Sequence, residues 1–516
     1  MSTSCGNPET ETGALMLRRP KFDKSKQCVR CKEKTGNIVI RHAVYCKECF
    51  STLISVKFRR ALDPTVNPLP DGPRRKGLKA GGDLLIGFSG GLGSTVLLDL
   101  MYRTYFSFHD APIDLTTGKP RGGKDHPRNL LVWSRGSVCY VEPCNAFPGA
   151  RLSLQMKDRT EHIRAIVEQY EDLTFIPLRI EDAFSRDWWD SVDLLLSSIS
   201  NEGNEGYSKS PVQQLQKYIF SLPTQTAILS TVQTLTRILL LHTASAIGSS
   251  HLLLGTSLTS LSISLISSIS QGGGFVVREE GKEEWVPPRS VTQMKTNGHE
   301  NGNIRVVRPL QDIGMKECAM WAWWHGLNVV GREKFPGGKQ SIGQLTKDFI
   351  VGLERDYPST VSTIARTCSK LAPKHGTDGI CLFCQRPAQY GLQDWRAQTA
   401  IRSFKSITSY RPPHFPERDT TDVPTSPSLP SLTPFLCYHC HTTLTSRSSR
   451  GTTAVSVSKD DPTPMPLWVT SSSAASTVSS TVRVATQDPY SGEEIWNRKK
   501  MDVEQMKATV AEFLFE

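Results

Sequence analysis

Eight of the 13 cysteines in this 516-residue chain fall into four Cys-x-x-Cys pairs, a spacing typical of metal ligands. Two pairs lie near the start of the sequence, Cys28/Cys31 and Cys46/Cys49. Two such turns at this distance can converge into a tetrahedral thiolate site, and four thiolates are a donor set that structural zinc prefers. Four protein ligands leave no open position on the metal. We therefore predict a structural zinc site rather than a catalytic one.

A second set of cysteines has the same spacing within each pair, but the two pairs are farther apart. The intervening chain is rich in Ser, Thr and Pro and can loop out, because the entropic penalty of closing a loop grows only logarithmically with its length. The histidines at 439 and 441 are alternative fourth ligands. We predict a second structural zinc site, formed by Cys381, Cys384, Cys437 and Cys440.

A glycine-rich segment has the pattern of a phosphate-binding loop. Ser-Gly-Gly-Leu-Gly-Ser at 89–94 follows the apolar run Leu84–Phe88 and precedes a helical pattern. Glycines let backbone N–H groups approach phosphate oxygens, and the start of a helix adds its dipole. A plain strand-to-helix turn is the alternative interpretation. The candidate nucleotide-binding residues, whose function we expect to be vestigial, are Ser89, Gly90, Gly91, Ser94 and Gly255.

Basic residues make RNA a candidate partner. The chain carries 61 Lys and Arg against 50 Asp and Glu, a formal net charge of +11, which favours nucleic acid without setting sequence specificity. Lys57, Arg59 and Arg60 flank the first cysteine unit and alternate with the aromatic Phe58. This mixture suits phosphate contact with occasional base stacking, so we predict that these three residues bind RNA.

The elements that must position these groups alternate between strand and helix. Strand patterns at 84–88, 137–142, 174–180, 251–256 and 305–309 are separated by helix patterns at 95–106, 152–170 and 231–247. Such alternation predicts an α/β fold with a doubly wound parallel sheet, whose ligands bind at the carboxyl ends of the strands.

Composition divides the chain into segments. We expect a Ser/Thr-rich segment without a packed core, and a terminal helix whose apolar stripe docks on the body or on a partner. The predicted segments are a disordered tail (1–27), an N-terminal zinc module (28–60), a basic Pro/Gly linker (61–82), the sheet domain (83–371) with surface insertions at 107–129 and 271–303, a C-terminal zinc module with a low-complexity insertion (372–445), the Ser/Thr-rich segment (446–490) and the terminal helix (491–516).

The sequence also favours a reducing compartment. No charged-then-apolar signal segment opens the chain, and paired thiols in such a protein indicate metal ligands rather than disulfides. The apolar-leaning stretch 238–269 is interrupted by His, Ser and Thr, and is not expected to cross a membrane. We expect a cytoplasmic protein without a membrane association.

Several motifs together resemble a known family. The first two cysteine pairs, the Ser-Gly-Gly-x-x-Ser loop, Leu254-Gly-Thr-Ser257 and Val307-Arg-Pro-Leu310 follow one another in this order. This set resembles the cytoplasmic tRNA 2-thiolation protein 2 family in its long, fungal-type form. That family is part of the pyrophosphate-loop superfamily. The resemblance implies an adenine nucleotide alpha hydrolase-like sheet flanked by zinc-ribbon-like modules at both ends.

The resemblance also implies a function. The family is required for 2-thiolation of the wobble uridine, giving 5-methoxycarbonylmethyl-2-thiouridine, in tRNAs for lysine, glutamate and glutamine. The expected partners are a related ATP-using thiolase subunit in a heterodimer, the tRNA, and a thiocarboxylated ubiquitin-like sulfur carrier. ATP is expected on the partner subunit.

This chain departs from the active relatives at four places, so we predict no catalytic residue. Leu92-Gly93 stands where they usually carry Lys-Asp, and Ser230-Thr-Val-Gln233 replaces a Cys-x-x-Cys. The segment 255–260 lacks a carboxylate for magnesium, and Glu142-Pro-Cys144 replaces Asp-Glu-Gly. Two alternatives stay open. The chain could be an active adenylating tRNA sulfurtransferase with Cys144 as sulfur carrier, or a zinc-dependent RNA-binding scaffold outside thiolation.

Overall fold

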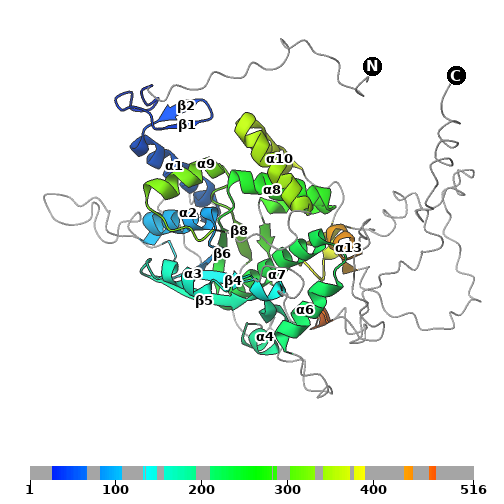
Figure 1. Cartoon of the computed structure of the whole chain (residues 1–516). Coiled ribbons are helices and arrows are strands. Elements are labelled where there is room, and N and C mark those ends of the chain that lie inside the picture. Colours follow the sequence, from blue (N-terminus) through cyan, green and yellow to red (C-terminus); the bar gives the residue numbers. More distant parts are fainter. Residues whose placement is uncertain are drawn as a thin grey trace, which may run out of the picture.

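A six-stranded sheet with helices on both faces forms the body of the protein, seen here in a computed structural model (Figure 1). Strands running through its centre are apolar because both of their faces are covered. The structure describes residues 26–66, 82–106, 132–133, 135–147, 156–192, 210–281, 283–287, 303–331, 341–371, 377–389, 435–445 and 464–471.

The sheet has the order β5-β4-β3-β6-β8-β7, and all neighbours are parallel except β7 and β8. The strand of this sheet that comes first in the sequence, β3, therefore lies inside the sheet, and the later strands add on both sides of it. This arrangement creates a switch point at the carboxyl end of β3, where ligands bind in open α/β sheets. The strands are β3 (Asp83–Gly87), β4 (Gly136–Glu142), β5 (Leu173–Arg179), β6 (Ser249–Leu254), β7 (Glu283–Trp285) and β8 (Ile304–Val307).

One face of the sheet carries the core built around Leu84, Ile86 and Leu253. The helices over this face are α1 (Lys47–Val66), α2 (Leu92–Met101), α3 (Thr160–Val167) and α9 (Met315–Trp324), and a π-helical turn, η1 (Tyr102–Phe106), extends α2. Helix α1 docks through a stripe of side chains at four-residue spacing, since this spacing stays on one side of a helix. The stripe consists of Phe50, Ile54, Phe58, Leu62 and Val66, all buried.

The opposite face carries a second core built around Leu85, Cys139 and Leu252. The helix α7 (Gln225–Ala246) crosses this face, with α4 (Arg186–Val192), α6 (Pro211–Ser221) and the 3-10 turns η3 (Cys144–Ala146) and η5 (Ile180–Phe184) beside it. Local sequence fixes where these helices begin. The side chains of Ser210 and Thr224 accept hydrogen bonds from the backbone N–H groups of residues 213 and 227, as N-cap residues do.

Three helices form a separate layer beyond β6. Helices α8 (Leu258–Ser270), α10 (Ile342–Asp356) and α11 (Pro358–Lys370) pack together through the buried Leu258, Ile350 and Val361. Ser257 and Ser341 cap the starts of α8 and α10 with their hydroxyl groups.

The predicted fold class is confirmed, because a doubly wound, mainly parallel sheet is present and each predicted strand overlaps an observed one. The predicted helices at 95–106 and 231–247 correspond to α2 with η1 and to α7. The predicted helix at 152–170 is shorter, spanning Thr160–Val167.

Three segment boundaries differ from the prediction. Helix α1 runs to Val66, so the expected linker begins later than residue 61. The expected insertion at 271–303 supplies the 3-10 helix η6 (Gly273–Glu280) and the edge strand β7, in which Trp285 is buried. Within the Ser/Thr-rich segment, α14 (Leu467–Ser471) carries the buried Trp468. The expected disordered tail up to residue 25, the insertion at 107–129 and the terminal helix lie outside the described residues.

Candidate metal centres and phosphate loop

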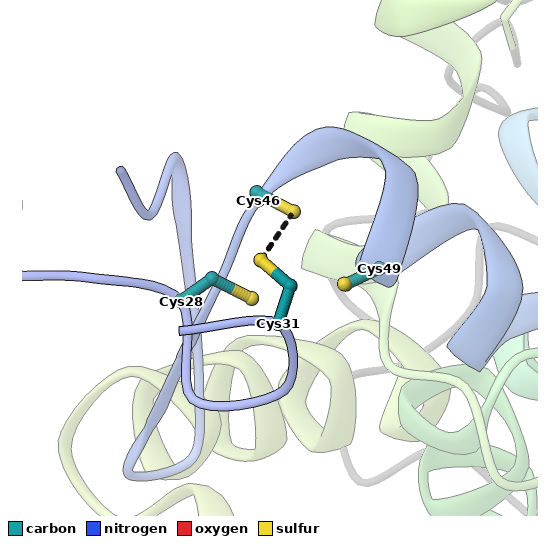
Figure 2. A group of neighbouring side chains, drawn as sticks. All are labelled: Cys28, Cys31, Cys46 and Cys49. Carbon is teal, nitrogen blue, oxygen red and sulfur yellow. Dashed lines mark hydrogen bonds between the residues drawn. The ribbon is translucent and has the colours of Figure 1, made fainter. Parts of the chain in front are cut away.

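Cys28, Cys31, Cys46 and Cys49 lie together at the start of α1 (Figure 2). Their sulfur atoms are all within 4.8 Å of one another, and the Sγ atoms of Cys31 and Cys46 are 3.8 Å apart. Four sulfurs bound to one zinc at about 2.3 Å lie about 3.8 Å from one another in a tetrahedron. The donor set and its spacing therefore fit zinc.

Local backbone geometry explains how these thiols converge. The first pair sits on a tight turn in which the N–H of Lys32 donates to the carbonyl of Cys28 at 2.8 Å, and Lys32 adopts a left-handed conformation with φ 59°. The second pair occupies the first turn of α1, where the helix dipole favours thiolate. The short strands β1 (Ile38–Ile40) and β2 (Ala43–Tyr45) join the two pairs as an antiparallel ribbon.

The second group, formed by Cys381, Cys384, Cys437 and Cys440, repeats this construction. The N–H of Gln385 donates to the carbonyl of Cys381 at 2.8 Å, and Gln385 has φ 52°, which matches the turn at the first site. The strands β9 (Thr377–Ile380) and β10 (Pro387–Gln389) flank the turn, and the second pair opens α13 (Tyr438–Thr445). All four of these sulfurs lie within 4.8 Å, and all four residues are buried. This set fits zinc as well.

The two predicted histidine alternatives are not needed, because four thiols already converge at the second site. His439 points elsewhere. Its Nε2 lies 3.1 Å from the hydroxyl of Ser230 and its Nδ1 lies 3.2 Å from the carbonyl of Gln271. These contacts hold α13 against α7 and the end of α8. His441 is buried beside Thr445 within α13.

The first site has thiols of unequal acidity. Burial raises the pKa of Cys28, but backbone hydrogen bonds from Cys31, Cys46 and Arg30 lower it to about 6. Burial raises the pKa of Cys46 to about 12. Thiolates in contact repel one another, so without a divalent cation one of them retains its proton. A bound zinc would remove this conflict by neutralising the thiolates.

A buried ionic network joins the second module to the edge of the sheet. Arg237 on α7 contacts Glu283 of β7 and donates to the carbonyl of Cys384 at 2.7 Å. Arg386, which follows the turn that carries Cys381 and Cys384, contacts Glu280 at 2.5 Å. Burial raises the pKa of Glu283, but the neighbouring Arg237 and Arg386 lower it to about 2, so this carboxylate stays ionised. The metal module and the sheet domain are therefore one packed unit.

The predicted phosphate loop follows β3, at the expected switch point, but it is packed against its own chain. Gly93 contacts the end of β6 so closely that a Cβ added to it would lie 2.1 Å from the carbonyl oxygen of Gly255. A Cβ added to Gly255 would lie 2.4 Å from the backbone nitrogen of Ser94. The hydroxyls of Ser89 and Ser94 lie 3.2 Å apart, and that of Ser94 donates to the carbonyl of Gly91. The five predicted residues thus lie together.

The segment after α9 closes the loop from another side. The N–H of Gly331 donates to the carbonyl of Gly90 at 3.0 Å, and a Cβ added to Gly90 would meet Ile163 and Val330. Arg159 fixes this segment by donating to the carbonyl of Gly331 at 2.8 Å. Gly90 has φ 70°, a left-handed conformation that favours glycine. The loop is thus held as a partly buried strand-to-helix turn.

The thiol of Cys144 lies near three carboxylates, whose effect on its pKa, together with burial, outweighs that of the neighbouring Arg179. Burial, together with Glu142, Asp158 and Glu181, raises its pKa to about 11. Glu142 itself accepts hydrogen bonds from the backbone of residues 144 and 159 and from the hydroxyl of Tyr140. A thiol in these surroundings remains protonated at neutral pH and is a poor nucleophile.

The three predicted RNA-binding residues have different surroundings. Lys57 contacts the carboxylate of Glu317 at 2.9 Å in a pair whose side chains are 24% and 9% exposed, so its charge is used within the protein. This contact joins α1 to α9. Arg59 and Arg60 are exposed on α1, and Arg59 lies near Tyr105 on the side of η1.

The structure adds one carboxylate that the sequence did not reveal. Segment 255–260 has none of its own, but Glu354 from α10 accepts hydrogen bonds from the hydroxyl of Thr259 at 2.7 and 2.8 Å. The hydroxyl of Thr259 also accepts a hydrogen bond from the N–H of Met315. Glu354 therefore serves the junction between α8, α9 and α10. No short-range pattern links residues 259 and 354.

Fold and site together define a doubly wound α/β protein with a strand–glycine loop–helix unit and two four-cysteine modules. The sequence profile of the family described as cytoplasmic tRNA 2-thiolation protein 2 matches residues 341–442, which include α10, α11 and part of the second module. Long alignments to members of that family, given below, agree with this match. The sequence thus matches the cytoplasmic tRNA 2-thiolation protein 2 family in both comparisons, in agreement with the resemblance of its motifs.

The relatives carry the family's name. Cytoplasmic tRNA 2-thiolation protein 2 of Xenopus tropicalis is 25% identical over 412 residues, covering 70% of this chain and 72% of the relative. The protein of the same name from Homo sapiens is 24% identical over 443 residues, covering 74% and 76%. That of the fungus Pyrenophora tritici-repentis is 24% identical over 389 residues, covering 72% and 88%. The relatives are named as cytoplasmic, in agreement with the predicted compartment.

Among solved structures, the U34-tRNA thiolase NcsA from Methanococcus maripaludis with its 4Fe–4S cluster is 16% identical to this chain. The alignment covers 68% of this chain and 90% of that one, with a TM-score of 0.40.

Within the described part of the chain, none of the helices has the length and apolar character needed to span a membrane.

Proposed function

We propose that this protein is a subunit required for 2-thiolation of the wobble uridine in lysine, glutamate and glutamine tRNAs, and that it is mainly non-catalytic. It would pair with an ATP-using thiolase subunit, which receives sulfur from a thiocarboxylated ubiquitin-like carrier. The family of its relatives, which are named for tRNA 2-thiolation, supports the pathway. The packing of the phosphate loop supports the division of labour.

The observation that carries the non-catalytic role is the contact between Gly93 and Gly255. The resemblance implies an aspartate at position 93 in working relatives, and the carbonyl of Gly255 occupies the space that its Cβ would need. Phosphoryl chemistry depends on charged or metal groups to stabilise the transition state. A loop that has no room for a side chain at position 93 and lacks those groups favours a supporting role.

The metal modules would hold this scaffold together. Zinc, bound by the two sets of four cysteines, would supply a rigid tetrahedral cross-link and no chemistry, because every position on the metal is taken by a thiolate. The first set would fix the ribbon β1–β2 to the start of α1. The second would fix α13 to the turn that carries Cys381 and Cys384, beside β7.

The test measures 2-thiouridine in glutamate tRNA by retardation on a mercury gel. Cells lacking the chain are compared with cells that carry the wild type, Cys28→Ser, or a Ser89→Ala/Ser94→Ala double variant. We expect loss of 2-thiouridine without the chain and with Cys28→Ser, and full rescue by the double variant. Partner binding and melting temperature are measured for each variant, so that a folding defect is recognised.

The other outcomes separate the alternatives. Unchanged 2-thiouridine without the chain would place it outside thiolation, as a zinc-dependent RNA-binding scaffold. Failure of a folded, partner-bound double variant would mean that the loop uses a phosphate. Loss of thiolation in a folded Cys144→Ser protein would identify an active sulfurtransferase and overturn the non-catalytic role.

A further inference from the structure

Trp323 is the most exposed large apolar side chain among the residues that the structure describes, at 73%. It lies on α9 together with the exposed Lys316 and the half-buried Met320, at the seven- and three-residue spacings that share one side of a helix. The opposite side of the same helix is buried through Cys318 and Trp321. An exposed indole contributes little to the core, so a ligand is the better explanation.

Helix α9 lies beside α1 (Figure 1), and three contacts join it to the first cysteine module. The ammonium of Lys316 donates to the carbonyl of Val39 in β1 at 2.9 Å. The ring of Trp324 meets that of Phe50 edge-to-face, with centroids 4.9 Å apart. Lys57 forms an ion pair with Glu317. Because Phe50 near the start of α1 meets the end of α9, and Lys57 farther along α1 meets the start of α9, the two helices run antiparallel. Trp323, next to Trp324, therefore lies beside the start of α1.

The module beside Trp323 is strongly basic. Residues 26–66 contain nine Lys and Arg against three Asp and Glu. Four thiolates around one zinc ion would remove two charges and leave the module positive. Several of these basic residues are exposed on the turns and at the start of α1, namely Lys26, Arg30, Lys32, Arg41 and Lys47.

We propose that Trp323 stacks on an unpaired base of RNA while phosphates of the same strand lie along the basic module. A positive surface next to an exposed aromatic ring is the combination that binds single-stranded nucleic acid, since every base has a π-face. The charge complementarity argues for RNA rather than for a protein partner. This inference rests on the proposed function, which makes tRNA the RNA in question. It moves the RNA contact from Lys57 to the face of α9.

The experiment measures binding of the full chain, loaded with zinc, to two RNA probes. One probe is unmodified glutamate tRNA made by transcription, and the other is a blunt RNA duplex with the same number of phosphates. The variants are Trp323→Ala, Trp323→Phe, and Phe349→Ala as the matched control, because Phe349 is also exposed (62%) but lies on α10. Zinc content and melting temperature confirm that each variant is folded.

We expect Trp323→Ala to weaken tRNA binding by about 5- to 150-fold, the range that base–aromatic stacking contributes. Trp323→Phe should restore most of the affinity, and duplex binding should be unchanged by the Trp323 and Phe349 variants. Lys47→Gln should weaken the binding of both probes and reduce the dependence of the affinity on salt concentration.

Three results would overturn the inference. In the first, Trp323→Ala binds tRNA within twofold of the wild type. In the second, it loses tRNA and duplex equally, which would indicate phosphate contacts alone. In the third, it binds RNA normally but no longer copurifies with the thiolase subunit, which would make this face a protein interface. The mercury-gel assay tests the proposed function separately, because it asks whether thiolation needs the chain at all.

Discussion

Replacing Gly93 tests whether the phosphate loop is closed. A Cβ at this position would lie 2.1 Å from the carbonyl oxygen of Gly255, roughly 1 Å inside van der Waals contact. Both groups are backbone, Gly93 in α2 and Gly255 directly after the end of β6, so no side-chain rotation can relieve the overlap. We therefore expect Gly93→Ala and Gly93→Asp to destabilise the protein, and neither to bind ATP.

The size of the effect follows from the packing. Overpacking of this kind costs about 1–3 kcal/mol, and the higher helix propensity of Ala offsets less than about 1 kcal/mol of it. A change of 1 kcal/mol shifts the melting temperature of a domain of this size by about 2–4 °C. Gly93→Ala should thus melt several degrees below the wild type. Gly93→Asp should melt lower still, because its carboxylate would face a carbonyl oxygen.

The matched control is Gly352→Ala in α10, where an added Cβ meets no atom within 4 Å. This substitution should raise the melting temperature slightly, because Ala favours a helix over Gly by about 1 kcal/mol. The assays are differential scanning calorimetry and equilibrium dialysis with ATP and magnesium. A Gly93→Asp protein that melted like the wild type and bound ATP would refute the reasoning, since the loop would then be open.

Three further predictions concern the other sites. The buried second metal site should release zinc to a chelator more slowly than the half-exposed first site, and Cys384→Ser should lower the melting temperature more than Cys31→Ser; equal release rates would contradict this. Because the pKa of Cys144 is raised to about 11, its thiolate fraction at pH 8 should be about 200-fold below that of a thiol with pKa 8.5. Alkylation of Cys144 should therefore be slow and should accelerate as the pH rises toward 11, and fast labelling at pH 7 would contradict this prediction. Lys57→Met should lower the free energy of unfolding by about 1–3 kcal/mol in denaturant titrations, since it leaves the nearly buried carboxylate of Glu317 without its cation. The affinity for tRNA should stay within twofold of the wild type, and a large loss of affinity would show that Lys57 contacts RNA.

The sequence alone determined much of the fold and both four-cysteine groups. The Cys-x-x-Cys pairs, the apolar strand 84–88 and the glycine loop after it are patterns of neighbouring residues. Local backbone preferences and the periodicity of burial decide such patterns, and for this reason each predicted strand overlaps an observed one. The fit of the donor sets to zinc could be predicted as well, because ligand type and spacing set it.

Only the tertiary structure decided how these parts are used. Gly331 closes the loop at Gly90 from more than 200 residues away, and Glu317 takes the charge of Lys57 from 260 residues away. The two pairs of the second metal site likewise meet across a long intervening segment. Such contacts depend on which faces pack together, and no local period encodes that choice. A glycine loop and a basic residue are therefore recognisable in the sequence, but whether each is free to bind a ligand is settled by packing.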